Sequence, residues 1–230
     1  MEKFIEKMKE LFTYWCMIIV NMIKNKKNVS NMVTISDGNN KMGKVASVSL
    51  LPILTCPKRC KETCGKKCYA KKLCALRPTV ANSYAKNTAI AIHSTKAYFK
   101  AINKAVQNVR YFRYHVSGDI HNKEYFRYMI KTAIDNENVS FLCFTKQYEL
   151  VNEWIKENGK IPGNLHILFS EWTNLKAINP YNLPTTNVYE KEEEIKDNWK
   201  LCGGNCLNCA CRGVGCWQAN NGETIAFKIH

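Results

Sequence analysis

The sequence lacks a hydrophobic run long enough to cross a bilayer, a low-complexity linker and an internal repeat. Its longest apolar stretch, residues 11–23, is interrupted by Asn21 and flanked by lysines, whereas a membrane-spanning helix needs about 20 apolar residues. No small-residue cleavage site follows this stretch, so a secretory signal is not expected. These absences predict a cytoplasmic protein in a reducing compartment.

Acidic residues are scarce, because 19 Asp and Glu stand against 34 Lys and Arg, for a formal net charge of +15. Such a balance favours a polyanionic partner, either nucleic acid or a phosphorylated substrate. Many of the cations surround one group of cysteines, where they would also offset the negative charge of metal-bound thiolates: Lys58, Arg59, Lys61, Lys66, Lys67, Lys71, Lys72 and Arg77.

The chain does not need disulfide bonds, since 230 residues that are 46% hydrophobic can bury an ordinary core. Its twelve cysteines are nevertheless concentrated, and ten fall into two short windows. Metal ligands must converge to within about 2.3 Å of one ion, which closely spaced thiols achieve readily. The sequence therefore predicts a metalloprotein, with these windows: Cys56, Cys60, Cys64, Cys68 and Cys74; and Cys202, Cys206, Cys209, Cys211 and Cys216.

The first window has a cysteine at every fourth position from Cys56 to Cys68. Structural zinc sites usually pair cysteines two to four apart with a second pair further on, whereas iron–sulfur clusters accept three or four thiolates from one loop. The spacing suits either metal and favours iron–sulfur. The alternative is a metal-free helix with cysteines on one face.

The second window has enough thiols for a complete site, with Cys202, Cys206, Cys209 and Cys216 as the expected ligands. Glycines at 203, 204, 213 and 215 allow the backbone to turn tightly around a metal. Spacing alone leaves zinc and iron–sulfur equally open. Cys60, Cys74 and Cys211 remain open between spare ligand, redox thiol and packing residue.

Apolar strands alternate with amphipathic helices along the chain, which predicts βα units and a mostly parallel sheet. We expect an α/β fold, as an open sheet or a partial (βα) barrel, in one domain at 41–230 whose Cys-rich segment is 202–217. The expected strands are 45–54, 112–117, 140–144, 165–169, 187–190 and 224–229, and the expected helices are 80–92, 95–109, 123–136 and 147–158.

Residues 1–40 form an N-terminal extension in which apolar residues recur at helical spacing between Phe4 and Met22. This pattern predicts an extra helix packed on the domain. A helix that lies on a membrane surface or binds a partner is the alternative.

Polar residues stand directly after successive predicted strands, and in parallel α/β folds these positions meet at the carboxyl edge of the sheet. They are Cys56, then Ser117, Gly118 and Asp119, then Thr145 and Lys146, then Ser170 and Glu171. We expect one site here, with Asp119, Lys146 and Glu171 as catalytic candidates.

His115, Asp119 and His121 alternate with other residues, so a continuing strand would place them on one face. A His/Asp/His site with a divalent ion for phosphodiester hydrolysis is one hypothesis. Hydrogen-bonded core histidines, with a strand that ends at Gly118, are the other.

Several motifs together resemble the gene product eighty-eight family of phage and mobile-element proteins over residues 45–230. These motifs are Ser-Leu-Leu-Pro at 49–52, Cys68-Tyr69-Ala70, the run 114–120, Phe144-Thr145-Lys146, the cysteines from Cys206 to Cys216-Trp217, and Phe227-Lys228-Ile229-His230. The family has no settled activity, so the resemblance implies a phage or mobile-element context.

A more distant resemblance is to radical S-adenosylmethionine enzymes, which carry a three-cysteine loop after the first strand. It implies that Cys56, Cys64 and Cys68 bind a [4Fe–4S] cluster, that Ser117, Gly118 and Asp119 contact S-adenosylmethionine, and that the second window binds an auxiliary cluster. The cysteine spacing differs from that family's, and the aromatic residue follows Cys68 instead of preceding it.

We therefore expect an iron–sulfur, radical-SAM-like enzyme that acts on nucleic acid or a nucleotide-derived substrate. The main alternative is a zinc-stapled protein that binds or modifies nucleic acid in phage or plasmid replication. The hydrolase described above and a base-exchange enzyme with Asp119 as nucleophile are further alternatives.

Overall fold

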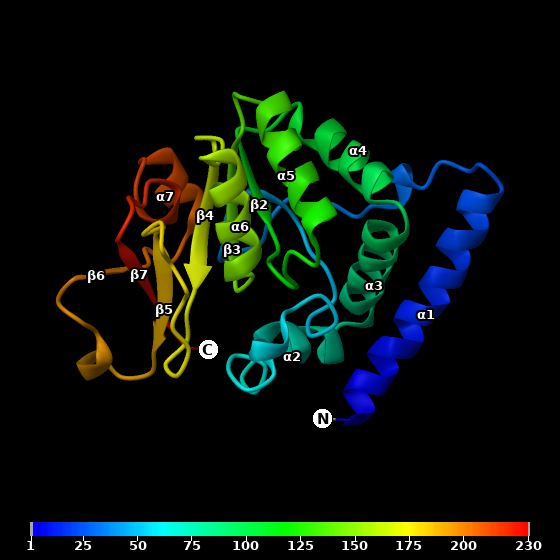
Figure 1. Ribbon diagram of the computed structural model, residues 1–230. Coiled ribbons are helices and arrows are strands. Elements are labelled where there is room, and N and C mark those ends of the chain that lie inside the picture. Colours follow the sequence, from blue (N-terminus) through cyan, green and yellow to red (C-terminus); the bar gives the residue numbers. More distant parts are fainter. Residues whose placement is uncertain (1, 230) are drawn as a thin grey trace.

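Seven parallel strands pair in the order β1-β2-β3-β4-β5-β7-β6 in the computed structural model, which describes residues 2–229 (Figure 1). The strands are β1 (Ala46–Val48), β2 (Tyr111–Tyr114), β3 (Ser140–Thr145), β4 (Leu165–Ser170), β5 (Thr185–Tyr189), β6 (Trp199–Leu201) and β7 (Thr224–Lys228). The helices are α1 (Glu2–Lys24), α2 (Tyr69–Leu76), α3 (Pro78–His93), α4 (Thr95–Val106), α5 (Lys123–Asp135), α6 (Tyr148–Asn158) and α7 (Cys206–Cys211). Short 3-10 turns lie at Ser30–Met32, Lys58–Cys60, Glu192–Glu194 and Gly215–Trp217.

The first five strands are added to the sheet in one direction. Connections between parallel strands are right-handed, so α3, α4, α5 and α6 all lie on the same face. In the described part of the chain, the edge strands β1 and β6 do not pair with each other. The α/β prediction is confirmed, and of its two forms the structure has the open sheet.

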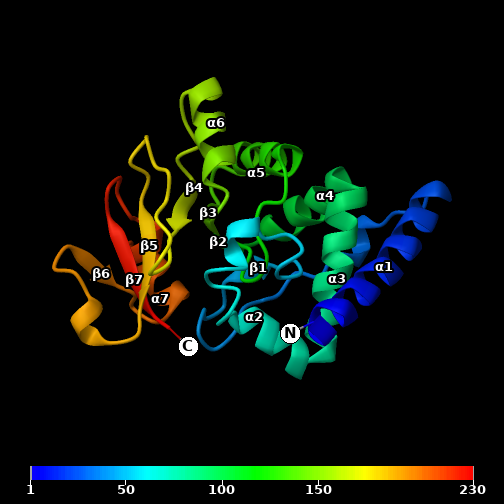
Figure 2. The same ribbon diagram turned by 60° about the horizontal axis from the view of Figure 1, so that its bottom comes forward.

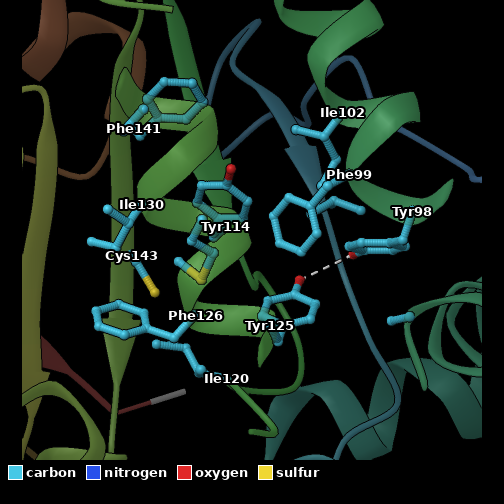
Figure 3. Close-up of a cluster of buried hydrophobic side chains, with 14 of the residues drawn as sticks. Tyr98, Phe99, Ile102, Tyr114, Ile120, Tyr125, Phe126, Ile130, Phe141 and Cys143 are labelled. Atoms are coloured by element: carbon cyan, nitrogen blue, oxygen red, sulfur yellow. Dashed lines mark hydrogen bonds between the residues drawn. The ribbon is translucent and has the colours of Figure 1, made fainter. Parts of the chain in front are cut away.

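The helix-covered face contains the main hydrophobic core. Phe141 and Cys143 on β3 point to this face, because alternate residues of a strand face opposite sides. Figure 3 shows them beside Phe99, Tyr114 and Tyr125, which are buried with Ile130 and Phe126 between the sheet and helices α4 and α5.

The other face of the sheet, the inner face, is covered by the Cys-rich C-terminal segment. Leu142 and Leu168 pack there against Ala210 of α7 and Trp217. The segment also reaches the start of the sheet, where Leu207 N donates a 3.0 Å hydrogen bond to Met42 O. The crossover helices all lie on one face of the sheet, so the second cysteine window covers the face that has no helices from these connections.

Helix α1 lies alongside α3 at the β1 end of the molecule (Figures 1 and 2). Its Met8 and Ile19 are buried, and Trp15 Nε1 donates a 2.8 Å hydrogen bond to Asn82 Oδ1 on α3. The predicted extra N-terminal helix is confirmed. Within residues 2–229, no helix combines the length and apolar character that crossing a membrane requires.

Two predicted strands are shorter than the apolar runs suggested. β1 ends at Val48, after which Leu50 N bonds to Ser117 O and the chain turns at Ile53, whose φ is +72°. β2 ends at Tyr114 because the next residue, His115, has a φ of +55°. Helices α2 and α7 and the short strand β6 were not predicted.

The burial of His115 predicts a specific pH dependence of stability. His115 is 4% exposed, its Nε2 lies 2.9 Å from Tyr125 Oη, and burial lowers its pKa to about 3. Because the unfolded-state pKa is near 6.5, this stabilisation is complete above about pH 6.5 and is lost as pH falls toward 3. The loss between about pH 7 and pH 5 amounts to about 2 kcal/mol.

We expect His115→Asn, a substitution that tolerates positive φ, to remove this loss. Urea unfolding at both pH values should show a steeper decrease for the wild type by about 2 kcal/mol. An identical decrease in both proteins would contradict the assignment.

Candidate functional site

The polar residues that follow β1 to β4 are joined side by side along the carboxyl edge of the sheet, the edge to which the strand arrows point (Figure 1). Asp119 N donates to Thr55 Oγ1 at 3.3 Å, and Thr145 Oγ1 donates to Asp119 Oδ1 at 2.6 Å. Lys146 Nζ then donates to Ser170 Oγ at 2.6 Å. One set of contacts therefore runs from the first cysteine loop to β4.

Asp119 is a buried carboxylate that accepts its hydrogen bonds from neighbouring residues of the sheet edge. It is 5% exposed, and besides Thr145 it accepts from Ile120 N at 2.7 Å and Lys146 N at 2.9 Å. Burial raises its pKa to about 6. Asp119 thus lies where it was expected, and its carboxylate clamps the end of β2 to the end of β3.

Lys146 is a buried cation whose charge acts on Asp119 and Cys64 without a direct ion pair to either. The residue is 5% exposed, and in the described residues it forms no ion pair. Its Nζ contacts Ser170 Oγ and, at 3.4 Å, Glu171 O, with the Trp172 ring 5.9 Å away. Burying an ammonium group among neutral partners is costly, so this position is suited to holding an anionic ligand group.

Glu171, the third catalytic candidate, uses its carboxylate for partners other than Lys146. It accepts from Lys176 Nζ at 2.7 Å, Ala177 N at 3.0 Å and Asn187 Nδ2 at 3.0 Å. The side chain thereby anchors the loop after β4 to β5, while its backbone carbonyl contacts Lys146.

Ser117 and Gly118 lock the turn after β2 against the segment that leads into the first cysteine window. Ser117 Oγ donates to Leu50 O at 2.9 Å. Gly118 has a φ of +83°, and a Cβ there would stand 2.6 Å from Thr55 Oγ1 and 2.7 Å from Leu50 Cβ. Only glycine fits this approach, and the Ser117 hydroxyl is already used by Leu50.

Four thiols of the first window are neighbours. Cys60 is hydrogen-bonded to Cys56 and Cys64, and Cys68 is close enough to both of these for their charges to interact. The Cys60 hydrogen bond, aided by the charge of Lys146, lowers the pKa of Cys64 to about 6. These thiols therefore lie beside the polar carboxyl edge.

Cys74 is separate from this group. It is 3% exposed and packs against Met8, Leu51 and Ala85 between α1, α2 and α3. Burial raises its pKa to about 11, which keeps it a neutral thiol. We assign Cys74 to packing.

Four thiols of the second window also gather, beneath the inner face of the sheet. The charges of Cys202, Cys206 and Cys209 all act on Cys216. Two glycines flank one sulfur and form a glycine cradle: a Cβ at Gly203 would stand 3.0 Å from Cys209 Sγ, which is tight, and one at Gly215 would stand 3.5 Å away, in ordinary contact. Cys211 is exposed and lies outside this group.

Arg113 is a residue of this second group that the sequence reasoning missed. It lies on β2 with its Nη1 3.5 Å from Cys206 Sγ and its guanidinium carbon 4.8 Å from the centre of the Phe144 ring. Its Nε is buried without a hydrogen-bond partner in the described residues. A charged residue inside an otherwise apolar and aromatic strand was the available signal.

The His/Asp/His hypothesis is not supported by the geometry. His115 Nε2 is used by Tyr125 and its Nδ1 faces Cys143, while the Asp119 carboxylate holds β3. Burial lowers the pKa of His121 to about 4, and its ring lies 4.8 Å from that of Tyr125. The positive φ of His115 breaks the alternation that the hypothesis required.

Both thiol groups have the donor atoms that bind a metal, but their sulfur atoms are not arranged around a common point in the described part of the structure. Over residues 2–229, no three His, Cys, Asp or Glu side chains converge closely enough to hold an ion. The second group has the features of a thiolate site in its glycine cradle and in two hydrogen bonds to sulfur, from Arg113 and from Gly204 N to Cys202 at 3.5 Å.

The Asp119 clamp can be tested by stability. Asp119→Ala leaves three buried donors without an acceptor, so we expect it to lower the free energy of unfolding by about 2–4 kcal/mol. Thr145→Val removes one of the same contacts and should cost about 1 kcal/mol. Denaturant unfolding measures both, and an Asp119→Ala protein as stable as the wild type would show that the carboxylate is not a clamp.

Comparison with known proteins yields one match. The family model described as Gene product 88 matches residues 19–220, so the match starts within α1, earlier than the resemblance at 45–230. Neither the curated proteins nor the solved structures contain a match. Because the model covers most of a chain whose cysteine windows and strand-end residues lie within the match, the protein belongs to the Gene product 88 family.

Proposed function

We propose that this protein is an iron–sulfur enzyme, with a [4Fe–4S] cluster at the carboxyl edge of the sheet and a second cluster on its inner face. The observation that carries the proposal is the grouping of eight thiols into two sets of four. One set stands beside Asp119 and Lys146, and the other stands in a glycine cradle.

The ligands at the carboxyl edge would be Cys56, Cys64 and Cys68, and Cys60 is the fourth thiol of this group. Cys60 is 7% exposed and bonded to two of the others, whereas these three are only partly buried. At the inner face the ligands would be Cys202, Cys206, Cys209 and Cys216. A cluster held at the edge would supply one-electron chemistry, as in the radical-SAM-like scheme with S-adenosylmethionine.

The protein's own groups at the edge would bind and orient the substrate. Lys146 is a buried cation that hydrogen-bonds only to neutral groups among the described residues, so it would bind a carboxylate or phosphate group of the substrate. Asp119 fixes the turn after β2, whose backbone at Ser117 and Gly118 adjoins the start of the cysteine loop. A nucleotide-derived or nucleic-acid substrate agrees with the net charge of +15.

Zinc is the alternative metal, and the thiols of the second cysteine window favour it. Four thiols from one short segment, with a glycine cradle, are a complete structural zinc set. In that case both windows would staple a protein that binds or modifies nucleic acid without radical chemistry.

Metal and acid-labile sulfide analysis of protein purified without oxygen tests the proposal. We expect about four irons and four sulfides for each cluster, with a visible absorption band. Replacing Cys56, Cys64 and Cys68 together by alanine should remove one cluster, and replacing the four expected ligands of the second window should remove the other. Cys74→Ala and Cys211→Ala should retain both, because these cysteines lie outside the two groups.

The outcomes separate the two candidates. Zinc without sulfide, in preparations made with and without oxygen, would overturn the iron–sulfur proposal in favour of the zinc-stapled protein. Protein that is folded and holds neither metal would overturn both.

Arg113 provides a test of the second site alone. Removing a residue that hydrogen-bonds to a metal ligand typically lowers metal affinity 10- to 100-fold. Arg113→Gln should therefore weaken metal retention by about that factor. The measurement is competition with a chelator, with the exposed Arg127→Gln on α5 as the matched control. Retention equal to that of the control would show that the Arg113–Cys206 contact does not support a metal.

A further inference from the structure

A groove of about 500 Å³ lies at the amino edge of the sheet, on the side opposite the carboxyl-edge site. Its floor includes Arg110, Ser140 and Asn164, which stand at or just before the starts of β2, β3 and β4. One wall is the end of the Cys-rich segment, with Arg212 and Trp217. The groove is therefore built by the sheet and its inner cover together.

The groove is separate from the thiol and lysine site. Strand β3, which runs between the two edges, has six residues and so a length of about 20 Å. Asp119 and Lys146 follow their strands, whereas the residues of the groove precede theirs. Figure 1 shows α7 (orange-red) toward one end of the strands and the first cysteine segment (cyan) at the other.

Two arginines give the groove its charge. Arg110 and Arg212 are both exposed, come from distant parts of the chain, and form no ion pair in the described residues. Glu137 is the acidic residue that the groove lining includes. Guanidinium groups bind phosphate oxygens through two parallel hydrogen bonds, which makes phosphate the ligand chemistry that suits this pair.

An aromatic ring stands beside these charges. Tyr111 is half-buried in the groove, with the Arg110 guanidinium carbon 5.6 Å from its ring centre and the Trp217 ring 5.3 Å away. Its hydroxyl donates to Ala210 O at 3.2 Å, so the ring is fixed in place. Cationic grooves with fixed aromatic rings are a recurring arrangement for single-stranded nucleic acids, whose bases stack on the rings.

We propose that the amino-edge groove binds single-stranded nucleic acid, with Arg110 and Arg212 on the phosphates and Tyr111 against a base. The proposal goes beyond the metal chemistry and does not depend on it, because no thiol of the two groups contributes to the contact.

Fluorescence anisotropy with a labelled single-stranded oligonucleotide of about 12 bases tests the groove. The variant Arg110→Gln/Arg212→Gln should bind at least about 10-fold more weakly than the wild type. Because each phosphate contact contributes about 0.7 to the salt slope of a single strand, the slope should fall by about 1.4. The matched control, Lys96→Gln/Lys100→Gln, removes the same charge from exposed positions on α4 and should stay within about 2-fold of the wild type.

Each other result overturns a defined part of the proposal. Equal losses in both double variants would show that binding is diffuse attraction to a basic surface. Unchanged binding in the arginine variant would place the nucleic acid elsewhere. Full competition by pyrophosphate at low concentration would identify a small phosphorylated ligand instead. Metal content, measured on the same samples, keeps these outcomes distinct from failure of the iron–sulfur proposal.

Discussion

The one-directional winding of the sheet is the constraint on which the rest of this structure depends. Strands β1 to β5 follow one another in order, and right-handed connections then place every crossover helix on the same face. The opposite face, with Leu142 and Leu168, would be exposed to water unless another segment covered it. The Cys-rich segment provides that cover through Ala210 and Trp217.

The same winding brings the strand-end residues together at the carboxyl edge, where they hold each other as much as they offer chemistry. The carboxylates of Asp119 and Glu171 each accept several hydrogen bonds from the framework. Lys146 differs, because it is buried among neutral groups. A framework that satisfies its acids with hydrogen bonds and leaves one cation without an ion pair is suited to bind an anion next to the first thiol group.

Much of the fold could be predicted because buried parallel strands read as apolar runs, as residues 140–145 and 165–170 do. The errors arose where backbone conformation overrides composition. The run at 45–54 leaves the sheet after Val48, whose partner Tyr114 is the last residue of β2, and it then turns at Ile53 with a positive φ. The strand expected to reach 117 stops before His115 because that residue also has a positive φ. Strand β6 is three residues long and largely exposed, so neither apolar content nor periodicity marked it.

The sequence by itself determined the α/β class, the two cysteine windows and the residues at the strand ends, since these follow from local pattern and spacing. Only the tertiary structure decided that Cys74 packs against α1, that Cys211 stands apart, and that Arg113 contacts Cys206. Those outcomes depend on contacts between segments far apart in the chain, 93 residues for Arg113 and Cys206, for which the chain carries no local signal. The amino-edge groove belongs to the same category, because its two arginines come near each other only when the C-terminal segment closes over the inner face of the sheet.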